Sequence, residues 1–425
     1  MKRVLSLFIT IALLAGIMSG CGNSANTAGD TQGSSSAVIS GTPSEDATNT
    51  DGLVKVDEFI IGCANHITGP TALTGVLRKN GYELGAKEVN EAGGIDGLPI
   101  KIMYEDDQGT NTGAVAAAQK IMSSNKAIVF LIDRSTMVNA VNPIIQENEI
   151  PTLFGATANS IDELNNDYFF RMRVKDGGNA QTMAKYLVES LGKKKVAALY
   201  CADTFGEGGN TETKKALKEN YDMAPVTEQK YTAGTKDYAA QLLAIKSADA
   251  DAIYAWGTNS EDNAIILRQF KELGLDKNMA FIGSAAYASS VTIDLAKENA
   301  DGIYSIYDFS PDDTRTELQN WYKAYKAEYN SEPDFWCLST YDQVKLVADA
   351  AKRAGLVKKI GNDYYIPELK EARAKLADAL RETDHYKGAI GDLYPDDYQN
   401  MVHNMAVVQI DSGKLRLIEN VTLDQ

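Results

Sequence analysis

The chain has 425 residues and a formal net charge of −16. This length exceeds what one hydrophobic core usually supports, so it predicts two folded lobes. The acidic balance argues against nucleic acid as a partner and against attachment to anionic lipid through surface charge.

Residues 1–20 have the pattern of a bacterial export signal. Lys2 and Arg3 precede an apolar run that is too short to span a bilayer comfortably, and small residues follow it. Met18-Ser19-Gly20-Cys21 resembles the lipobox, in which the cysteine is lipidated, with Met18 in place of the usual leucine. An ordinary secretory signal with an incidental cysteine is the alternative.

Residues 21–53 are predicted to form a disordered tether, because they contain almost no large apolar side chain to bury. A lipid on Cys21 is then the only expected contact with the membrane. No second membrane-spanning segment follows in the sequence. The folded body is therefore expected outside the cytoplasm, anchored to the outer face of the cell membrane.

The first folded segment reads as a strand, a turn and a helix. The apolar run Phe59–Ala64 predicts a buried strand, Thr68-Gly69-Pro70 breaks it, and a helix is expected near Ala72–Ala92 until Gly93-Gly94 ends it. The positive end of this helix would point beyond the carboxyl end of the strand, where an anionic ligand is favoured.

Strand-like and helix-like segments then alternate twice, which predicts an α/β protein with two doubly wound parallel sheets. The expected strands are 59–64, 100–104, 127–132, 151–154 and 168–172, and then 196–201, 226–231, 252–256 and 280–282. The expected helices are 72–92, 112–123, 137–147, 207–219, 238–247 and 261–273.

The last part of the chain departs from this alternation. A strand at 302–309 is followed by three expected helices at 314–329, 340–354 and 367–380, and the segments 405–410 and 415–418 read as a closing hairpin. Such a chain is expected to cross between the lobes several times and form a hinge, with a ligand cleft between the lobes. The predicted first lobe is 54–173 plus 311–386, and the second is 174–310 plus 387–425.

Cysteine and histidine usage argues against metal and cofactor sites. Cys63, Cys201 and Cys337 remain in the folded body without CxxC spacing, and buried free thiols are expected at Cys63 and Cys201. The three histidines are remote from one another in sequence, and neither GxSxG nor HExxH occurs. We expect neither an enzyme nor a metal or cofactor site.

Several short motifs occur in a characteristic order. They are the Thr68-Gly69-Pro70 turn, Asn90-Glu91-Ala92-Gly93-Gly94-Ile95-Asp96-Gly97, Asp106-Asp107, Gly155-Ala156-Thr157, Phe170-Arg171, Phe205-Gly206-Glu207-Gly208 and Tyr341-Asp342. In this order the chain resembles the Leu/Ile/Val-binding branch of the solute receptors of ABC importers, which have the type I periplasmic-binding-protein-like fold.

This resemblance implies a receptor that performs no chemistry. Its two lobes would close on a small molecule, an amino acid of the branched-chain type or a related carboxylate or amide, and deliver it to ABC permease subunits. A monomer is expected. A receptor of the same fold that signals instead of transporting is the alternative.

The resemblance also places ligand-binding residues. In the first lobe, Ser135-Thr136 and Gly155-Ala156-Thr157 are expected to bind a ligand carboxylate through hydroxyl and main-chain N–H groups, although Ser135 and Thr157 could instead be plain helix caps. In the second lobe, Phe205 is expected to cover the ligand. Trp256 could line the same cleft or pack in the core.

Some positions depart from the family pattern. Ala285 lies where amino-acid receptors usually place an acid for the ligand's ammonium group, so either Asp203 or Glu261 replaces that acid or the ligand lacks an amine. Thr74 replaces a frequent aromatic residue. His66, in the first strand-to-helix loop, could reach the cleft, although a lone histidine is more often structural. Arg134 could bind a carboxylate, but a surface pair with Asp133 is the simpler expectation.

Overall fold

A computed structural model describes residues 50, 52–310 and 312–422. The predicted signal segment, the lipidated Cys21 and nearly all of the predicted tether therefore lie outside the described residues. Residues Thr50–Gln425 form one compact unit. Within the described residues, no helix is both long enough and apolar enough to cross a membrane.

The first sheet has five parallel strands in the order β3-β2-β4-β5-β6. The central strands β2 and β4 are apolar and almost fully buried, as expected for a sheet covered on both faces, whereas the edge strand β3 is mostly half-buried. The strands are β2 (Phe59–Asn65), β3 (Ile100–Asp106), β4 (Val129–Ile132), β5 (Thr152–Phe154) and β6 (Phe169–Arg171). The first helices are α1 (Ala72–Glu91), α2 (Asn111–Ser123), α3 (Ser135–Asn148) and the 3₁₀ turn η1 (Asn159–Leu164).

Helix α1 follows the sequence prediction closely. It begins at Ala72, two residues after Pro70, and Gly94 ends it with φ +69° and a hydrogen bond from its N–H to the carbonyl of Val89. Helix α1 packs against α10 (Phe335–Arg353). A Cβ on Gly81 would lie 2.1 Å from the hydroxyl oxygen of Thr340, so glycine permits this close approach.

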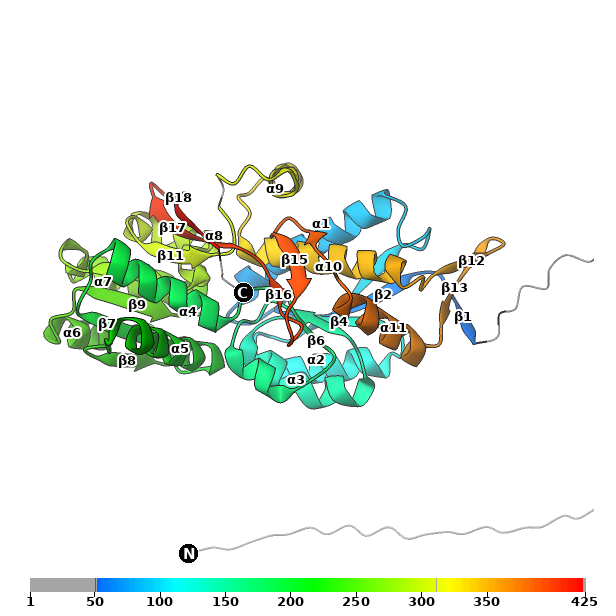
Figure 1. Cartoon of the computed structure of the whole chain (residues 1–425), viewed down its shortest axis with the longest axis horizontal. Coiled ribbons are helices and arrows are strands. Elements are labelled where there is room, and N and C mark those ends of the chain that lie inside the picture. The colour runs from blue at the N-terminus through cyan, green and yellow to red at the C-terminus, as the bar shows by residue number, and fades with distance from the viewer. Residues whose placement is uncertain (1–49, 51, 311, 423–425) are drawn as a thin grey trace, which may run out of the picture. The chain divides into compact units, whose positions relative to one another are not determined.

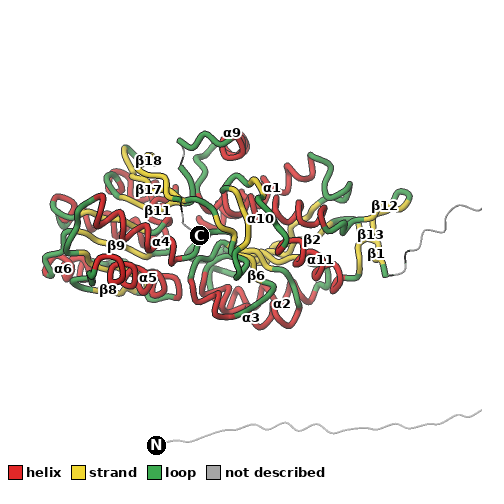
Figure 2. Tube along the Cα trace, in the orientation of Figure 1, coloured by secondary structure: helices red, strands yellow, loops and turns green. Residues whose placement is uncertain are grey.

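The second sheet has seven strands in the order β18-β17-β11-β10-β9-β7-β8 and is flanked by helices (Figures 1 and 2). Its strands are β7 (Val196–Cys201), β8 (Glu228–Tyr231), β9 (Ala252–Trp256), β10 (Ala280–Gly283), β11 (Tyr304–Tyr307), β17 (Met405–Asp411) and β18 (Lys414–Val421). The first five are parallel, and the predicted closing hairpin is confirmed as antiparallel β17 and β18.

The helical segments of this part are α4 (Asp176–Lys185), α5 (Thr204–Tyr221), α6 (Ala239–Ser247), α7 (Ser260–Glu272) and α8 (Ser290–Ala296). The short turns are η2 (Tyr186–Ser190), η3 (Leu275–Lys277), η4 (Ala285–Ala288) and η5 (Lys297–Ala300). The sequence did not predict α4 or α8.

The three late helices are confirmed as α9 (Thr316–Tyr329), α10 and α11 (Leu369–Arg381). Two small sheets were not predicted. One joins β1 (Leu53–Val56) to the hairpin of β12 (Lys358–Ile360) and β13 (Asp363–Pro367), and the other contains β14 (Tyr386–Lys387), β15 (Asp392–Pro395) and β16 (Met401–Val402).

The chain passes between the two large sheets after β6, after β11 and before β17, as a hinge of several crossovers requires. Buried arginines link these crossovers. Arg173 forms two hydrogen bonds with Asp308, at 2.9 and 2.7 Å, and the Nε of Arg171 donates to Asn400 at 2.7 Å. These contacts hold the three connections together.

The lobe boundaries given above stay a prediction. The N–H groups of Ala389 and Ile390 bond to Asp342 of α10, at 3.1 and 2.6 Å. Because α10 packs on the first lobe, we propose that the last return crossing lies nearer to His403 than to Lys387.

Candidate ligand-binding site

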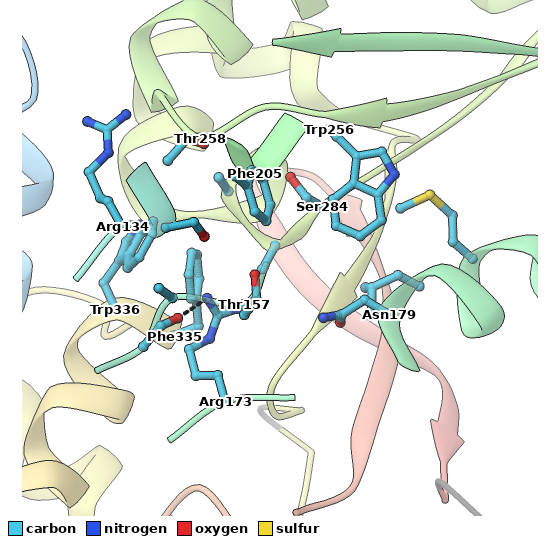
Figure 3. Close-up of a pocket in the computed structure, with 17 residues that line it drawn as sticks. Arg134, Thr157, Arg173, Asn179, Phe205, Trp256, Thr258, Ser284, Phe335 and Trp336 are labelled. Atoms are coloured by element: carbon cyan, nitrogen blue, oxygen red, sulfur yellow. Dashed lines mark hydrogen bonds between the residues drawn. The ribbon is translucent and has the colours of Figure 1, made fainter. Parts of the chain in front are cut away.

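A pocket, open to solvent, lies where the carboxyl ends of strands from both large sheets meet (Figure 3). This is the edge at which open α/β sheets usually bind ligands. The pocket is lined by Arg134, Ser135, Gly155, Ala156, Thr157, Arg173, Asn179, Met183, Phe205, Trp256, Thr258, Ser284, Ala285, Ala286, Ile306, Phe335 and Trp336.

The loops after β4 and β5 supply small polar groups to the pocket. Ser135 begins α3, and its hydroxyl accepts a hydrogen bond from the N–H of Ala158 at 3.3 Å. Thr157 accepts the N–H of Asp176 at its carbonyl, 2.8 Å away. Neither Ser135 nor Thr157 is the N-cap of the helix beside it, since those caps are Arg134 and Ala158. The plain-cap interpretation of both residues is therefore wrong.

The second sheet supplies two aromatic side chains. Phe205, in the first turn of α5, packs edge-on against Trp256 at 5.3 Å between ring centroids. Trp256 ends β9, is 1 % exposed, and donates its indole N–H to Thr213 at 2.9 Å. Trp256 is thus both a core residue and a pocket residue, so the two interpretations of its role are compatible.

Helix α10 supplies two more aromatic side chains, Phe335 and Trp336. The carboxylate of Asp334 caps the helix by accepting the N–H of Trp336 at 2.9 Å. The guanidinium of Arg173 lies 4.5 Å from the centre of the Phe335 ring, and that of Arg78 lies 4.0 Å from the Trp336 ring. Both rings therefore already make a cation–π contact.

Arg134 does not form the expected surface pair with Asp133. Asp133 is buried, accepts the N–H of Gly155 at 2.6 Å and lies 3.3 Å from Arg78. Arg134 instead reaches across to the second sheet and donates to the side chain of Asn259 at 2.8 Å. Its φ of +76° is unusual for a residue with a side chain. In Figure 3 its guanidinium lies at the edge of the pocket, away from Thr157 and Phe205.

Three residues named from the sequence do not line this pocket: Thr74, His66 and Thr136. Thr74 is buried in α1, where its hydroxyl donates to the carbonyl of Thr71. The His66 Nδ1 lies 2.5 Å from Asp107, and burial together with the charge of Arg78 lowers the pKa of His66 to about 4. The structure thus holds His66 neutral inside the first lobe.

Asp176 is a fully buried acid directly behind the pocket wall. It begins α4, and neither of its carboxylate oxygens has a hydrogen-bond partner of normal geometry among the described residues. Burial raises the pKa of Asp176 to about 7, while the Thr157 hydroxyl and the charges of Arg171 and Arg173 oppose that rise.

The sequence analysis missed the contributions of α10, Arg173 and α4 to the pocket. The predicted start of α10 at Thr340 excluded Phe335 and Trp336, although Pro333-Asp334 is a recognisable N-cap signal. Arg173 and α4 carried no local signal, because their place in the pocket depends on the crossover between the sheets.

The described residues contain no group of three or more histidine, cysteine or acidic side chains that could hold a metal ion. Cys63, Cys201 and Cys337 are buried free thiols, which confirms the expectation for the first two. A second, wider hollow beside α4, α5 and β15–β18 shares only Arg173 with the pocket, and none of the residues named from the sequence lines it.

Comparisons with known proteins agree with this architecture. A profile of the family described as "Periplasmic binding protein" matches residues 59–414. The chain is 27% identical to Leu/Ile/Val-binding protein homolog 1 of Brucella abortus, over 80% of this chain and 86% of that protein. It is also 27% identical to the leucine-, isoleucine-, valine-, threonine-, and alanine-binding protein of Pseudomonas aeruginosa, over 70% of this chain and 79% of that protein.

Solved structures of solute-binding proteins are similar to this chain in fold. The branched-chain amino acid transporter substrate-binding protein LivJ of Streptococcus pneumoniae, in complex with isoleucine, is 25% identical, with a TM-score of 0.74 over 85% of this chain and 99% of that chain. A solute-binding protein of R. palustris in complex with benzoate is 19% identical and shares the fold, with a TM-score of 0.77 over 87% of this chain and 98% of that chain. The chain therefore belongs to the periplasmic binding protein family, whose members are extracytoplasmic solute receptors and not enzymes, and within it resembles the Leu/Ile/Val-binding type.

Proposed function

We propose that this protein is the solute receptor of an ABC importer and binds a small ligand with an apolar body, an amino acid of the branched-chain type or a related carboxylate or amide. The main support for this proposal is the composition of the pocket. Both large sheets contribute to it, and it combines aromatic walls with a few hydroxyl and N–H groups.

The proposed ligand contacts come from both sheets. Ser135, Ala156 and Thr157 would bind a carboxylate or amide oxygen through hydroxyl and main-chain N–H groups, while Gly155, whose own N–H donates to Asp133, lines the same wall. The aromatic and apolar groups would enclose the rest of the ligand, namely Phe205, Trp256, Ala285, Ile306, Phe335 and Trp336.

A ligand that touches both sheets stabilises the arrangement in which they are close together. The permease would then recognise that arrangement, so that transport depends on ligand. A monomer suffices, because one chain supplies the whole pocket. The test of this step is import by proteoliposomes carrying the cognate permease and ATPase. Ligand-dependent stimulation of a sensor kinase without import would favour the signalling alternative.

Titration calorimetry with a broad panel of amino acids, amides, urea and organic acids tests the binding proposal itself. Micromolar or tighter binding of at least one member is expected. If no member of the panel binds, the proposal is wrong.

Lipid anchoring through Cys21 is a separate part of the proposal, supported by the lipobox-like sequence. Labelled palmitate should be incorporated into the wild-type protein but not into the Cys21→Ala variant, which should appear in the soluble fraction. Release of both proteins into the soluble fraction would contradict anchoring.

A further inference from the structure

We propose that the pocket selects a small carboxylate with an apolar body and without an ammonium group. This inference rests on the proposed function and narrows it: a deaminated acid is expected in place of an amino acid. Four features of the described residues support it, namely the absence of an acid in the pocket lining, the engagement of nearby acids, the cations that contact the aromatic walls, and the start of a helix with hydroxyl residues on the opposite wall.

The pocket lining contains two arginines and, among the described residues, no aspartate or glutamate. Ala285 takes the place where an acid was expected, and its side chain is 7 % exposed. A buried ammonium group needs a negative or strongly polar partner, because losing its hydration without one is costly. The lining offers such a group only neutral oxygens.

The acids near the pocket are already engaged. Asp133 accepts the N–H of Gly155, and Asp308 binds Arg173 through both oxygens. The carboxylate of Asp203 caps α5 by accepting the N–H of Gly206 at 2.8 Å. None of these three carboxylates lines the pocket, and an ammonium group would have to share each of them with the groups that it already binds.

Two further acids do not line the pocket, and each has at least one buried carboxylate oxygen without a hydrogen-bond partner of normal geometry among the described residues. The Asp176 oxygens are closed off behind Thr157, and protonation is favoured there up to a pH of about 7. Glu261, the other substitute considered from the sequence, lies in the first turn of α7 and does not line the pocket.

The aromatic walls also disfavour a cation. Arg173 and Arg78 occupy one face of Phe335 and Trp336, at 4.5 and 4.0 Å from the ring centres. A ring attracts a cation through the negative potential of its faces, and a guanidinium on one face weakens that potential for a second cation on the other. These walls are suited to a neutral apolar or aromatic group.

The opposite wall suits an anion. Helix α3, which has 14 residues, begins at Ser135, and its first turn contains no acid. The buried Asp133, two residues before it, is paired with Arg78 and with the N–H of Gly155. Ser135 and Thr157, which carry hydroxyl groups, line the pocket on this side. A carboxylate therefore has favourable partners here, whereas an ammonium group does not.

Matched ligand pairs test the proposal on the full-length protein in detergent. L-Leucine is compared with 4-methylpentanoate, and L-phenylalanine with 3-phenylpropanoate, so that each pair differs only in the ammonium group. Any other member of the panel that binds is compared with its aminated or deaminated counterpart. The acid without an ammonium group is expected to bind at least tenfold tighter, and the pair that responds distinguishes a branched from an aromatic body.

Equal or tighter binding of the amino acid, or of an amide in preference to its acid, would overturn this proposal but leave the solute-receptor function intact. Failure of the whole panel would overturn both. If leucine binds and Asp176→Asn abolishes its binding, Asp176 is the missing ammonium partner and the inference is wrong.

Ala285→Glu supplies an acid in the pocket lining. This variant is expected to bind the amino acid of the responding pair at least tenfold more tightly than the wild-type protein does. A variant that folds, as judged by its melting temperature, but gains no affinity for the amino acid would contradict the argument. If Ala285→Glu does not fold, the comparison of the matched ligand pairs on the wild-type protein tests the proposal by itself.

Discussion

At the scale of single residues, Thr157 and Asp176 show how a neighbouring group affects the role of a side chain in the pocket. Thr157 lines the pocket and is 2 % exposed, and behind it lies the carboxyl group of Asp176. Thr157 therefore contributes to the ligand site, and its hydroxyl is also affected by the charge of Asp176. Experiments on Thr157 or Asp176 need a controlled pH.

Thr157→Ala is expected to weaken ligand affinity by about 1–3 kcal/mol, because a buried ligand oxygen loses its hydrogen-bond donor. The measurement is titration calorimetry at pH 5.5, where Asp176 is mostly protonated and the apo melting temperature should hardly change. Thr157→Ser keeps the hydroxyl and should retain most of the affinity. A loss of apo stability as large as the loss of affinity would instead indicate a structural role.

Asp176 is expected to make the stability of the protein fall as the pH rises. Burial raises its pKa from 3.8 to about 7, so between these values the folded protein holds a proton that the unfolded chain releases. The stabilising effect of that proton is complete below a pH of about 4 and is lost as the pH rises through about 7.

Asp176→Asn should therefore show little change in melting temperature at pH 4 and a gain of a few degrees at pH 8, both relative to wild type. Thermal unfolding across this pH range measures the difference, with the exposed-site variant Glu163→Gln as the control. A difference that does not vary with pH would argue against a buried, protonated Asp176.

At the scale of elements, the periodicity of apolar residues made the large sheets and most helices predictable. Short or exposed elements were not predicted from the sequence. Strand β1 pairs with β13 across more than 300 residues, and β12 pairs with β13 in a hairpin. All three are mostly exposed or half-buried, so no continuous apolar run marked them. The first turn of α10 was not predicted, although Phe335 and Trp336 are buried in the core and Pro333-Asp334 precedes them as an N-cap signal.

Helix α5 offers a matched pair of glycines for a stability experiment. A Cβ on Gly209 would lie 2.1 Å from the indole of Trp256, whereas the nearest atom to a Cβ on Gly208 is 3.9 Å away. Gly209→Ala is expected to destabilise the protein by about 1–3 kcal/mol and to displace Trp256, because the buried site has no room.

Gly208→Ala should instead stabilise the same helix by up to about 1 kcal/mol, because alanine is the better helix former. Urea unfolding compares the two variants under identical conditions. Equal effects of the two substitutions would contradict the close contact between α5 and Trp256.

At the scale of the whole molecule, the crossovers join the two sheets through buried charges. The Arg173–Asp308 pair is 9 % and 4 % exposed at its side chains and connects the segments that follow β6 and β11. Asp308→Ala leaves the Arg173 charge buried without its partner and is expected to cost about 3–5 kcal/mol in the free energy of unfolding.

The double variant Arg173→Met, Asp308→Leu removes both charges and should cost less than Asp308→Ala alone. Urea unfolding of the three proteins measures both differences. A cost below about 1 kcal/mol for Asp308→Ala would mean that the pair does not hold the crossovers together.

The sequence by itself determined the α/β class, the two sheets, the closing hairpin and the family, because apolar periodicity and turn residues act locally along the chain. The resemblance to the Leu/Ile/Val-binding branch also pointed to Ser135, Thr157, Phe205 and Ala285, and all four line the pocket. Only the tertiary structure decided that Phe335, Trp336 and Arg173 join them, and that His66 and Thr74 do not. The physical reason is that a pocket between two sheets is built from segments whose proximity depends on the crossovers, and no local pattern encodes that proximity.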